Sequence, residues 1–246
     1  MRLYHTSDLH NHRGFAPRLQ ALQARDPGYL IDCGDALRGS QTVYHRHEPI
    51  LAEMAEAGYA LSALGNREFH YLYACMRARF ASVQRPVVCA NLLDTFGRPL
   101  PFQAMHSIPW EGQRRLHFFG LLVVQYPEQS LWERFLGWRF RDPIEVACEI
   151  AERIPPGDGL VALSHLGLAA DRRLARAVPR LDLILGGHSH DTLLQPEYVG
   201  SVPIIHAGPY GKYVSATDLT FDEDAQRLRI AQAQLLPLLP QHAEGE

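Results

Sequence analysis

Short apolar segments that stop at a polar residue recur along the first ninety residues, and they constrain the fold more than any other feature. Four of these segments are typical of buried β-strands, and the three stretches between them carry apolar residues at helical spacing. The expected strands are 2–6, 29–33, 59–64 and 87–90, and the expected helices are 15–25, 49–57 and 71–82. Strands that alternate with helices predict a largely parallel sheet covered by helices.

The rest of the chain is less regular at first and then returns to the same rhythm. We expect strands at 104–108 and 115–124, then a helix to about residue 154, a strand at 160–163, a helix at 171–177 and a strand at 181–185. The alternation in 202–206, 214–221 and 227–236 is typical of antiparallel strands. We expect one domain, residues 1–240, and a disordered tail, residues 241–246.

Composition excludes several classes of protein. The 246 residues are 46% hydrophobic and 21% charged with a net charge of −3, which suits a globular domain and not a binder of polymeric nucleic acid. No apolar segment is long enough for a signal peptide or a membrane span, so we expect no membrane association. The four cysteines form no C-x-x-C pair, and we expect reduced thiols in the cytoplasm.

Polar side chains follow the expected strands where each strand ends. They are Asp8, His10, Asp35, Asn66, His165, His188 and His190. Because the carboxyl ends of parallel strands meet at one edge of a sheet, these side chains can gather there. Nitrogen and oxygen ligands without thiolate suit manganese, iron, cobalt, nickel or zinc.

Charge favours a pair of divalent metal ions, with manganese as the first expectation. Two such ions bring four positive charges, and Asp8 and Asp35 return two negative ones. The remainder would hold a phosphate dianion and help to ionise water. Asp35 is the best candidate to bridge the ions, because a carboxylate offers two oxygens.

The motifs resemble those of the calcineurin-like metallophosphoesterases, which run D-x-H, G-D-x-x, G-N-H-[DE], H and G-H-x-H. All five have counterparts here in order, and "VCANLLD", "FRDPIEVA" and "HAGPYGKYV" resemble the metallophosphatase domain of the 5′-nucleotidase group. The resemblance implies an α/β fold, a four-layer αββα sandwich with two mixed sheets flanked by helices.

The resemblance also implies two sets of metal ligands. The first metal would be held by Asp8, His10, Asp35 and His190, and the second by Asp35, Asn66, His165 and His188. Proteins of the 5′-nucleotidase group usually carry a second domain that stacks the nucleobase. This chain shows no counterpart of it, so a preference for nucleosides does not carry over directly.

The third motif departs from the family, because Arg67 and His70 stand where a His and an Asp are usual. The usual His is thought to stabilise the transition state or protonate the leaving oxygen. An arginine cannot give up a proton, but its planar fork of donors suits phosphate oxygens. We expect Arg67 to clamp the phosphoryl group and His70 or His12 to supply any proton. The alternative is that Arg67 points outward into a salt bridge.

Two further places have both a functional and a structural interpretation. Asn91 follows a strand, so it could contact substrate or simply form a turn. The aromatic segment around Trp132, Phe135 and Trp138 could overhang the site and stack a base, or it could anchor a long loop.

The sequence therefore predicts a dinuclear, metal-dependent phosphoesterase in which a metal-bound hydroxide attacks small phosphate esters, nucleotides or related metabolites first among them. The catalytic residues would be Asn66, Arg67 and His70, with substrate contacts from Arg67, His12 and Asn91. The alternative is a phosphodiesterase that favours good leaving groups, because Arg67 replaces the usual His. A third hypothesis is a metal-binding module that binds a phosphorylated ligand without catalysis.

Overall fold

The structure of the protein is a computed structural model, which describes residues 1–239. The strands are β1 (Arg2–Thr6), β2 (Tyr29–Asp32), β3 (Leu61–Ala63), β4 (Val87–Val88), β5 (Leu92–Asp94), β6 (Met105–Pro109), β7 (Arg115–Leu122), β8 (Trp138–Phe140), β9 (Gly159–His165), β10 (Leu183–Gly186), β11 (Glu197–Val199), β12 (Val202–His206), β13 (Tyr213–Asp222) and β14 (Arg227–Pro237). The helices are α1 (Ala16–Arg25), α2 (Pro49–Glu56), α3 (Tyr73–Phe80), α4 (Leu131–Leu136), α5 (Pro143–Ala151) and α6 (Leu168–Ala177). The tail predicted at 241–246 lies outside the described residues.

The first sheet has six strands in the order β14-β13-β1-β2-β3-β4. Strands β1 to β4 run parallel, as the alternation of strands and helices predicts, and β13 and β14 add an antiparallel edge. The helices between these strands begin at residues that suit the first turn of a helix. Proline opens α2, for example, where a backbone donor would be unpaired in any case.

The second sheet also has six strands, in the order β11-β12-β10-β9-β7-β6. Strands β7, β9, β10 and β12 are parallel, while β6 and β11 pair antiparallel at the two edges. The sequence predicts antiparallel pairing for 202–206. The strand β12 does pair antiparallel with β11, but its pairing with β10 is parallel, so the prediction is wrong on that side. All five residues of β12 are buried, because the strand lies inside the sheet, where a parallel neighbour is usual.

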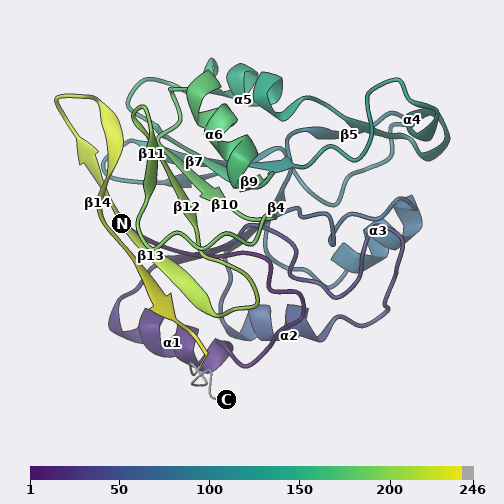
Figure 1. The fold of residues 1–246 in the computed structure, drawn as a ribbon, viewed down its shortest axis with the longest axis horizontal. Coiled ribbons are helices and arrows are strands. Elements are labelled where there is room, and N and C mark those ends of the chain that lie inside the picture. The colour runs from purple at the N-terminus through teal and green to yellow at the C-terminus, as the bar shows by residue number, and fades with distance from the viewer. Residues whose placement is uncertain (240–246) are drawn as a thin grey trace.

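The two sheets pack face to face and helices cover their outer faces (Figure 1), which confirms the predicted αββα sandwich. Buried side chains of both sheets form the central core, including Leu3, Ile31, Phe118 and Leu185. Helices α1 and α2 pack on the first sheet, and α5 and α6 pack on the second. The carboxyl ends of parallel strands from both sheets thus open on the same side of the molecule.

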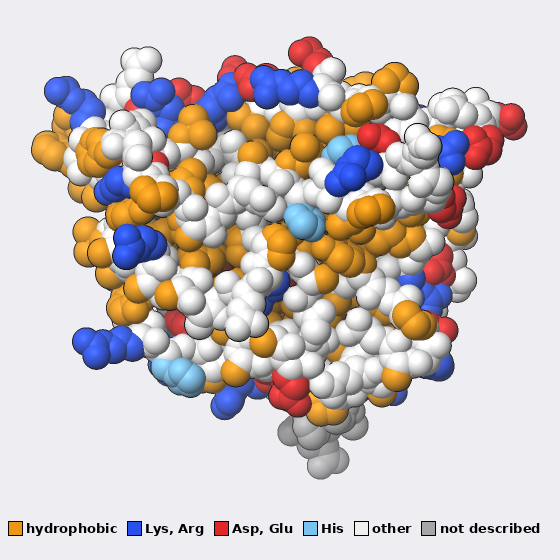
Figure 2. Space-filling model, turned by 180° about the vertical axis from the view of Figure 1, so that it is seen from behind, with side chains coloured by type: hydrophobic (Ala, Val, Ile, Leu, Met, Phe, Trp, Pro, Cys, Tyr) orange, Lys and Arg blue, Asp and Glu red, His pale blue; other side chains and the backbone are white. Residues whose placement is uncertain are grey.

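The surface opposite to the view of Figure 1 is largely hydrophobic or uncharged. In Figure 2, the Lys and Arg side chains form no continuous stripe across this face. Among residues 1–239, none of the helices has both the length and the apolar character needed to cross a membrane.

Candidate dinuclear metal centre

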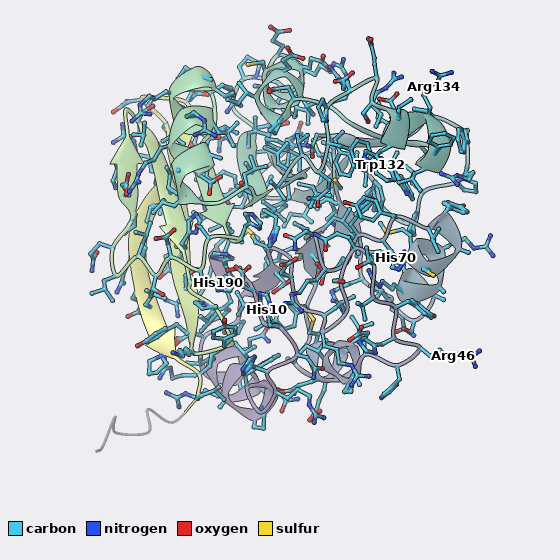
Figure 3. The ribbon with its side chains drawn as sticks, turned by 45° about the vertical axis from the view of Figure 1, so that its right-hand side comes forward. His10, Arg46, His70, Trp132, Arg134 and His190 are labelled. Atoms are coloured by element: carbon cyan, nitrogen blue, oxygen red, sulfur yellow. The ribbon has the colours of Figure 1, made fainter. Side chains whose placement is uncertain are left out.

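The predicted ligands come from loops that follow strands of both sheets. Asp8 and His10 follow β1, Asp35 follows β2 and Asn66 follows β3 in the first sheet. In the second sheet, His165 ends β9, while His188 and His190 follow β10. The fold therefore brings ligands from the two sheets together, and Figure 3 shows His10 and His190 side by side from the two halves of the molecule.

Three of these residues form what we call the open group: Asp8, His10 and His190. Their ligand atoms all lie within 4.8 Å of one another. The Nε2 atoms of His10 and His190 are 3.1 Å apart, and they lie 3.8 Å and 3.6 Å from Asp8 Oδ1. The side chain of His190 is 36% exposed, so this group is accessible to solvent.

Three others form what we call the buried group: Asp35, His165 and His188. Their ligand atoms also lie within 4.8 Å of one another. His165 Nε2 is 3.2 Å from Asp35 Oδ1 and 3.1 Å from the side-chain oxygen of Asn66. The side chain of His165 is fully buried, and the Asn66 amide completes the set of donors.

Asp35 connects the two groups. Its Oδ1 faces His165, and its Oδ2 lies 3.9 Å from His10 Nε2 of the open group. A carboxylate with one oxygen toward each group has the geometry of a bridging ligand, as its chemistry predicts.

The backbone is strained at these positions. Five of the seven predicted ligands have positive φ without being glycine, in the range 48° to 77°: Asp8, His10, Asp35, His188 and His190. Such conformations cost free energy and persist where the surrounding structure enforces them, and they concentrate at functional sites.

Neighbouring groups hold the ligands in place. His165 Nδ1 lies 2.8 Å from the Cys33 carbonyl, which favours a proton on Nδ1 and leaves Nε2 free to bind a metal. The backbone N–H of Arg67 donates to Asp35 Oδ1 at 2.7 Å, and the N–H of His188 donates to the Asp8 carboxylate. These hydrogen bonds link the third motif to Asp35 of the second motif, and the fifth motif to Asp8 of the first.

Glu68 is a structural residue of the site that sequence reasoning missed. Its buried carboxylate accepts four backbone N–H groups, from Gly65, Asp35, Ala36 and Leu37. It therefore joins the turn that carries Asn66 to the turn that carries Asp35. The available signal was its place as the acidic position of the third motif, G-N-H-[DE].

The electrostatics of the buried group fit a cation. Burial alone would raise the pKa of Asp35, but the positive charge of His165 outweighs it and lowers that pKa to about 2. Burial would likewise lower the pKa of His165, yet Asp35 raises it to about 10. Burial and the charge of His165 lower the pKa of His188. A proton on His165 supplies the positive charge that a metal ion would supply, so the donors present fit divalent metals.

Arg67 lies beside the bridging carboxylate. Its Nε is 3.9 Å from Asp35 Oδ2, and its Nη1 donates to the carbonyls of Arg38 and Gly39. The side chain is 32% exposed. From this position the guanidinium can reach an anion at the site. The alternative of an outward salt bridge is wrong, because the carboxylate nearest to Arg67 is that of Asp35, in the site.

His70 does not lie where a proton donor is needed. The ring is buried, Nδ1 accepts the backbone N–H of Leu72 at 3.0 Å, and the ring also hydrogen-bonds to the Thr42 backbone. Burial and the charge of Arg79 lower the pKa of His70. In Figure 3 it lies apart from His10 and His190. The predicted role of proton donor does not fit this position, because the ring joins two backbone segments.

His12 and Tyr210 flank the open group. The ring of His12 is exposed and lies 4.5 Å from that of Tyr210, which in turn contacts His10 at 5.6 Å and His190 at 5.4 Å between ring centroids. A role for His12 stays a prediction. The residue Tyr210 has a positive φ of 65°, and its ring lies against two predicted metal ligands.

Asn91 has a structural role, which corrects the predicted substrate contact. The residue is fully buried, its Nδ2 donates to the carbonyls of Leu122 and Arg141, and its Oδ1 accepts the N–H of Leu122. It therefore connects the end of β7 to the segment after β8. No part of the side chain is free to meet a substrate.

The aromatic segment divides into an anchor and an exposed helix. Trp138 is fully buried and donates its Nε1–H to the Tyr71 carbonyl at 2.8 Å. Trp132 and Phe135 on α4 are 62% and 75% exposed. The anchoring interpretation is correct for Trp138, while stacking by the other two stays a prediction.

Comparison with known proteins places the chain in a family. The family model described as calcineurin-like phosphoesterase matches residues 1–192. The uncharacterized metallophosphoesterase YunD of Bacillus subtilis is 31% identical over 242 residues, which are 90% of this chain and 50% of YunD. A 2′,3′-cyclic-nucleotide 2′-phosphodiesterase/3′-nucleotidase of Salmonella typhimurium is 22% identical over 83% of this chain and 38% of its own length.

Solved structures agree with the sequence comparison. The 5′-nucleotidase precursor of Thermus thermophilus superimposes with a TM-score of 0.77 at 26% identity, over 96% of this chain and 54% of that protein. The chain thus spans about half the length of the relatives that it matches. The match to the family model ends before β11, and all seven predicted ligands lie within it. The chain belongs to the calcineurin-like phosphoesterase family.

Proposed function

We propose that this phosphoric ester hydrolase acts on small phosphate esters, nucleotides or related metabolites first among them, by attack of hydroxide on phosphorus. The observation that carries the proposal is the position of Asp35, with one oxygen toward each of two adjacent ligand groups. The relatives named as nucleotidases support a nucleotide-like substrate, although the chain spans only part of their length.

The proposed chemistry depends on two divalent ions held by the open and buried groups, manganese first among the candidates. Bound there, they would supply Lewis acidity to the phosphoryl oxygens and lower the pKa of water toward neutrality. The chain's own residues would position the reaction. Asn66 and Asp35 orient the site, and Arg67 offsets negative charge on the phosphoryl oxygens.

A specific observation favours a second candidate, a phosphodiesterase for small or cyclic diesters. Both hydrogen bonds of His70 are made with backbone groups. Arg67 and His70, which stand in place of the usual His–Asp pair of the third motif, therefore offer no group that can deliver a proton. An alkoxide leaving group needs such a proton most. Substrates with good leaving groups would then be preferred, unless His12 provides the proton.

The deciding experiment is hydrolysis of an aryl phosphate monoester and the matched aryl diester with added Mn²⁺, before and after chelation. We expect turnover of at least one ester that is lost with chelator and restored by Mn²⁺. Absence of turnover of both esters by protein that binds two metal ions would overturn the proposal. It would favour the third hypothesis, a binding module without catalysis.

We further propose one functional domain over residues 1–240 and a cytoplasmic location. The four cysteines are free thiols, which is compatible with a reducing compartment.

A further inference from the structure

A second cleft lies away from the metal centre, between α2, α3 and the loop that precedes α2. Its volume is about 600 Å³, which is within the range of small-molecule sites. None of the seven predicted metal ligands lines it. Arg46 marks its outer edge, and Figure 3 shows this residue at the opposite side of the view from His10 and His190.

Five of the fifteen residues that line the cleft carry cationic or imidazole side chains. They are Arg46, Arg79, Arg85, His45 and His47. Glu48 is the one carboxylate in the lining, and it already accepts the backbone N–H groups of Arg38 and Gly39. With both histidines neutral, the lining keeps two positive charges in excess.

Arg85 is a partly buried cation with few partners, and its guanidinium lies 6.0 Å from the ring centroid of Tyr59. Its Nε donates to the Ser62 hydroxyl at 2.6 Å, and its Nη2 contacts the Met54 sulfur at 3.3 Å. Among residues 1–239 it makes no ion pair within 4.0 Å. A guanidinium has five N–H donors, and a buried charge without a counter-ion is costly, so an anion in the cleft would satisfy this group.

The carboxyl group of Asp32 influences the pKa of Arg85, but the two side chains form no ion pair within 4.0 Å. Burial, with the charge of Glu68, raises the pKa of Asp32 to about 8. Asp32 is therefore largely protonated near neutral pH, while burial lowers the pKa of Arg85 without discharging it.

Arg79 adds a buried donor without a partner. The side chain is almost completely buried, and its terminal nitrogens donate to backbone carbonyls of Arg67, Phe69, Ser40 and Val43 at 2.5 to 2.8 Å. Its Nε is buried and has no hydrogen-bond partner among the described residues. The same side chain therefore lines the cleft and holds the turn that carries Arg67.

The remaining wall of the cleft is apolar. Leu51, Ala52 and Ala55 of α2 face Ala78 and Val83 at the end of α3. A ligand with an anionic end and an apolar or aromatic body matches both parts of this lining.

We propose that the α2–α3 cleft binds a small organic phosphate at a site separate from the metal centre, with the phosphate held by Arg85, Arg46 and His47. The apolar body of the ligand lies along Ala52, Ala55 and Ala78. The proposal does not rest on the proposed function, because Arg85, Arg46 and His47 are not residues of the catalytic centre.

The test uses phenylphosphonate, which has a phosphate-like dianion, an aromatic body and a P–C bond that a phosphoesterase does not hydrolyse. Binding is measured by calorimetry on the whole chain carrying Asp35→Asn, in which the metal centre is disabled. We expect one phenylphosphonate per chain. We expect at least about tenfold weaker binding after Arg46→Ala and His47→Ala are added, because charged hydrogen bonds to the anion are lost.

The matched control is Arg134→Ala in the same background, since Arg134 is an exposed arginine on α4, far from Arg46 in Figure 3. It should leave the affinity unchanged. If the Asp35→Asn protein does not fold, metal-loaded wild-type protein serves instead. It should bind two phenylphosphonate ions, and Arg46→Ala with His47→Ala should weaken one of the two binding steps by at least about tenfold.

The proposal is overturned if the Asp35→Asn protein binds no phenylphosphonate, or if the cleft substitutions change its affinity no more than Arg134→Ala does. Failure of the proposed function would look different. It would remove ester hydrolysis by the wild-type protein and leave this binding intact.

Discussion

The open and buried groups have similar donors but different surroundings. In the buried group, the Asp35 side chain is 5% exposed and that of His165 is fully buried, and both are fixed by backbone groups of neighbouring loops. In the open group, His190 is 36% exposed and has Tyr210 as a ring neighbour, and Tyr210 in turn contacts His12. From this difference we expect that a metal ion would bind more firmly at the buried group than at the open group, which is the more accessible to a substrate.

The contrast follows from how each ligand is oriented. A His whose second nitrogen bonds to a carbonyl is held in one tautomer and one ring position, which strengthens metal binding. His165 has such a partner in the Cys33 carbonyl. His10 and His190 instead direct their Nε2 atoms at each other across 3.1 Å.

The largest effect should come from the residue that the two groups share. Asp35→Asn removes the charge of the bridge, and we expect kcat/KM for an aryl phosphate with Mn²⁺ to fall at least about 10³-fold. Asp191→Asn is the control, since Asp191 is adjacent to His190 without belonging to either group. A loss below about tenfold for Asp35→Asn would mean that the groups do not act together.

Arg67 should contribute next, because it lies beside the bridge without being a ligand. Arg67→Ala should lower kcat/KM by about 10²-fold through loss of charge stabilisation on the phosphoryl group. Arg67→His tests the proton argument in the same assay. That substitution should raise the relative rate on esters with poor leaving groups, and an unchanged rate on those esters would refute the argument.

Substitution of one ligand in either group should have a smaller effect, a loss of affinity for Mn²⁺ at that group. His165→Ala should weaken the tighter of two Mn²⁺ binding steps, and His190→Ala the weaker one, each by about 10- to 100-fold in calorimetric titrations. The comparison fails if His190→Ala affects the tighter step instead.

The smallest effect is a pH dependence confined to the buried group of the metal-free protein. His165, with its pKa raised from 6.5 to about 10, stabilises the fold below pH 6.5, and this contribution is lost as pH rises toward 10. Asp35, with its pKa lowered from 3.8 to about 2, contributes above pH 3.8 and loses this contribution as pH falls. The free energy of unfolding should therefore decline by about 1 kcal/mol or more between about pH 6 and pH 9.

Urea unfolding of the metal-free protein at the two pH values measures this decline. His165→Ala should remove most of it, and His190→Ala should not. Equal declines in both variants would show that the buried pair is not its source.

The alternation of strands and helices predicted a parallel sheet with the ligands gathered at its strand ends, whereas the two-sheet sandwich was implied by the resemblance to the metallophosphoesterases. It missed β5, β8 and β11, because strands of only three residues are too short to show an alternation of apolar and polar side chains. Its antiparallel pairing for β12 is right for β11 and wrong for β10, because the neighbours of a buried strand come from distant parts of the chain.

Residues beside the ligands were harder to predict, because their roles depend on where their hydrogen bonds go. Asn91 and His70 looked available in the sequence, yet both are engaged with backbone groups. Glu68 and Tyr210 looked ordinary, and the first holds two ligand turns together while the second borders the open group. Sequence position does not determine these contacts.

The central claim is that Asp35 joins two adjacent metal sites. Anomalous diffraction at the manganese edge from crystals grown with Mn²⁺ tests it most directly. The account predicts two peaks about 3.5–4 Å apart, one against Asp8, His10 and His190 and one against His165 and His188, with Asp35 between them. A single peak, or two peaks of which neither contacts Asp35, would contradict it.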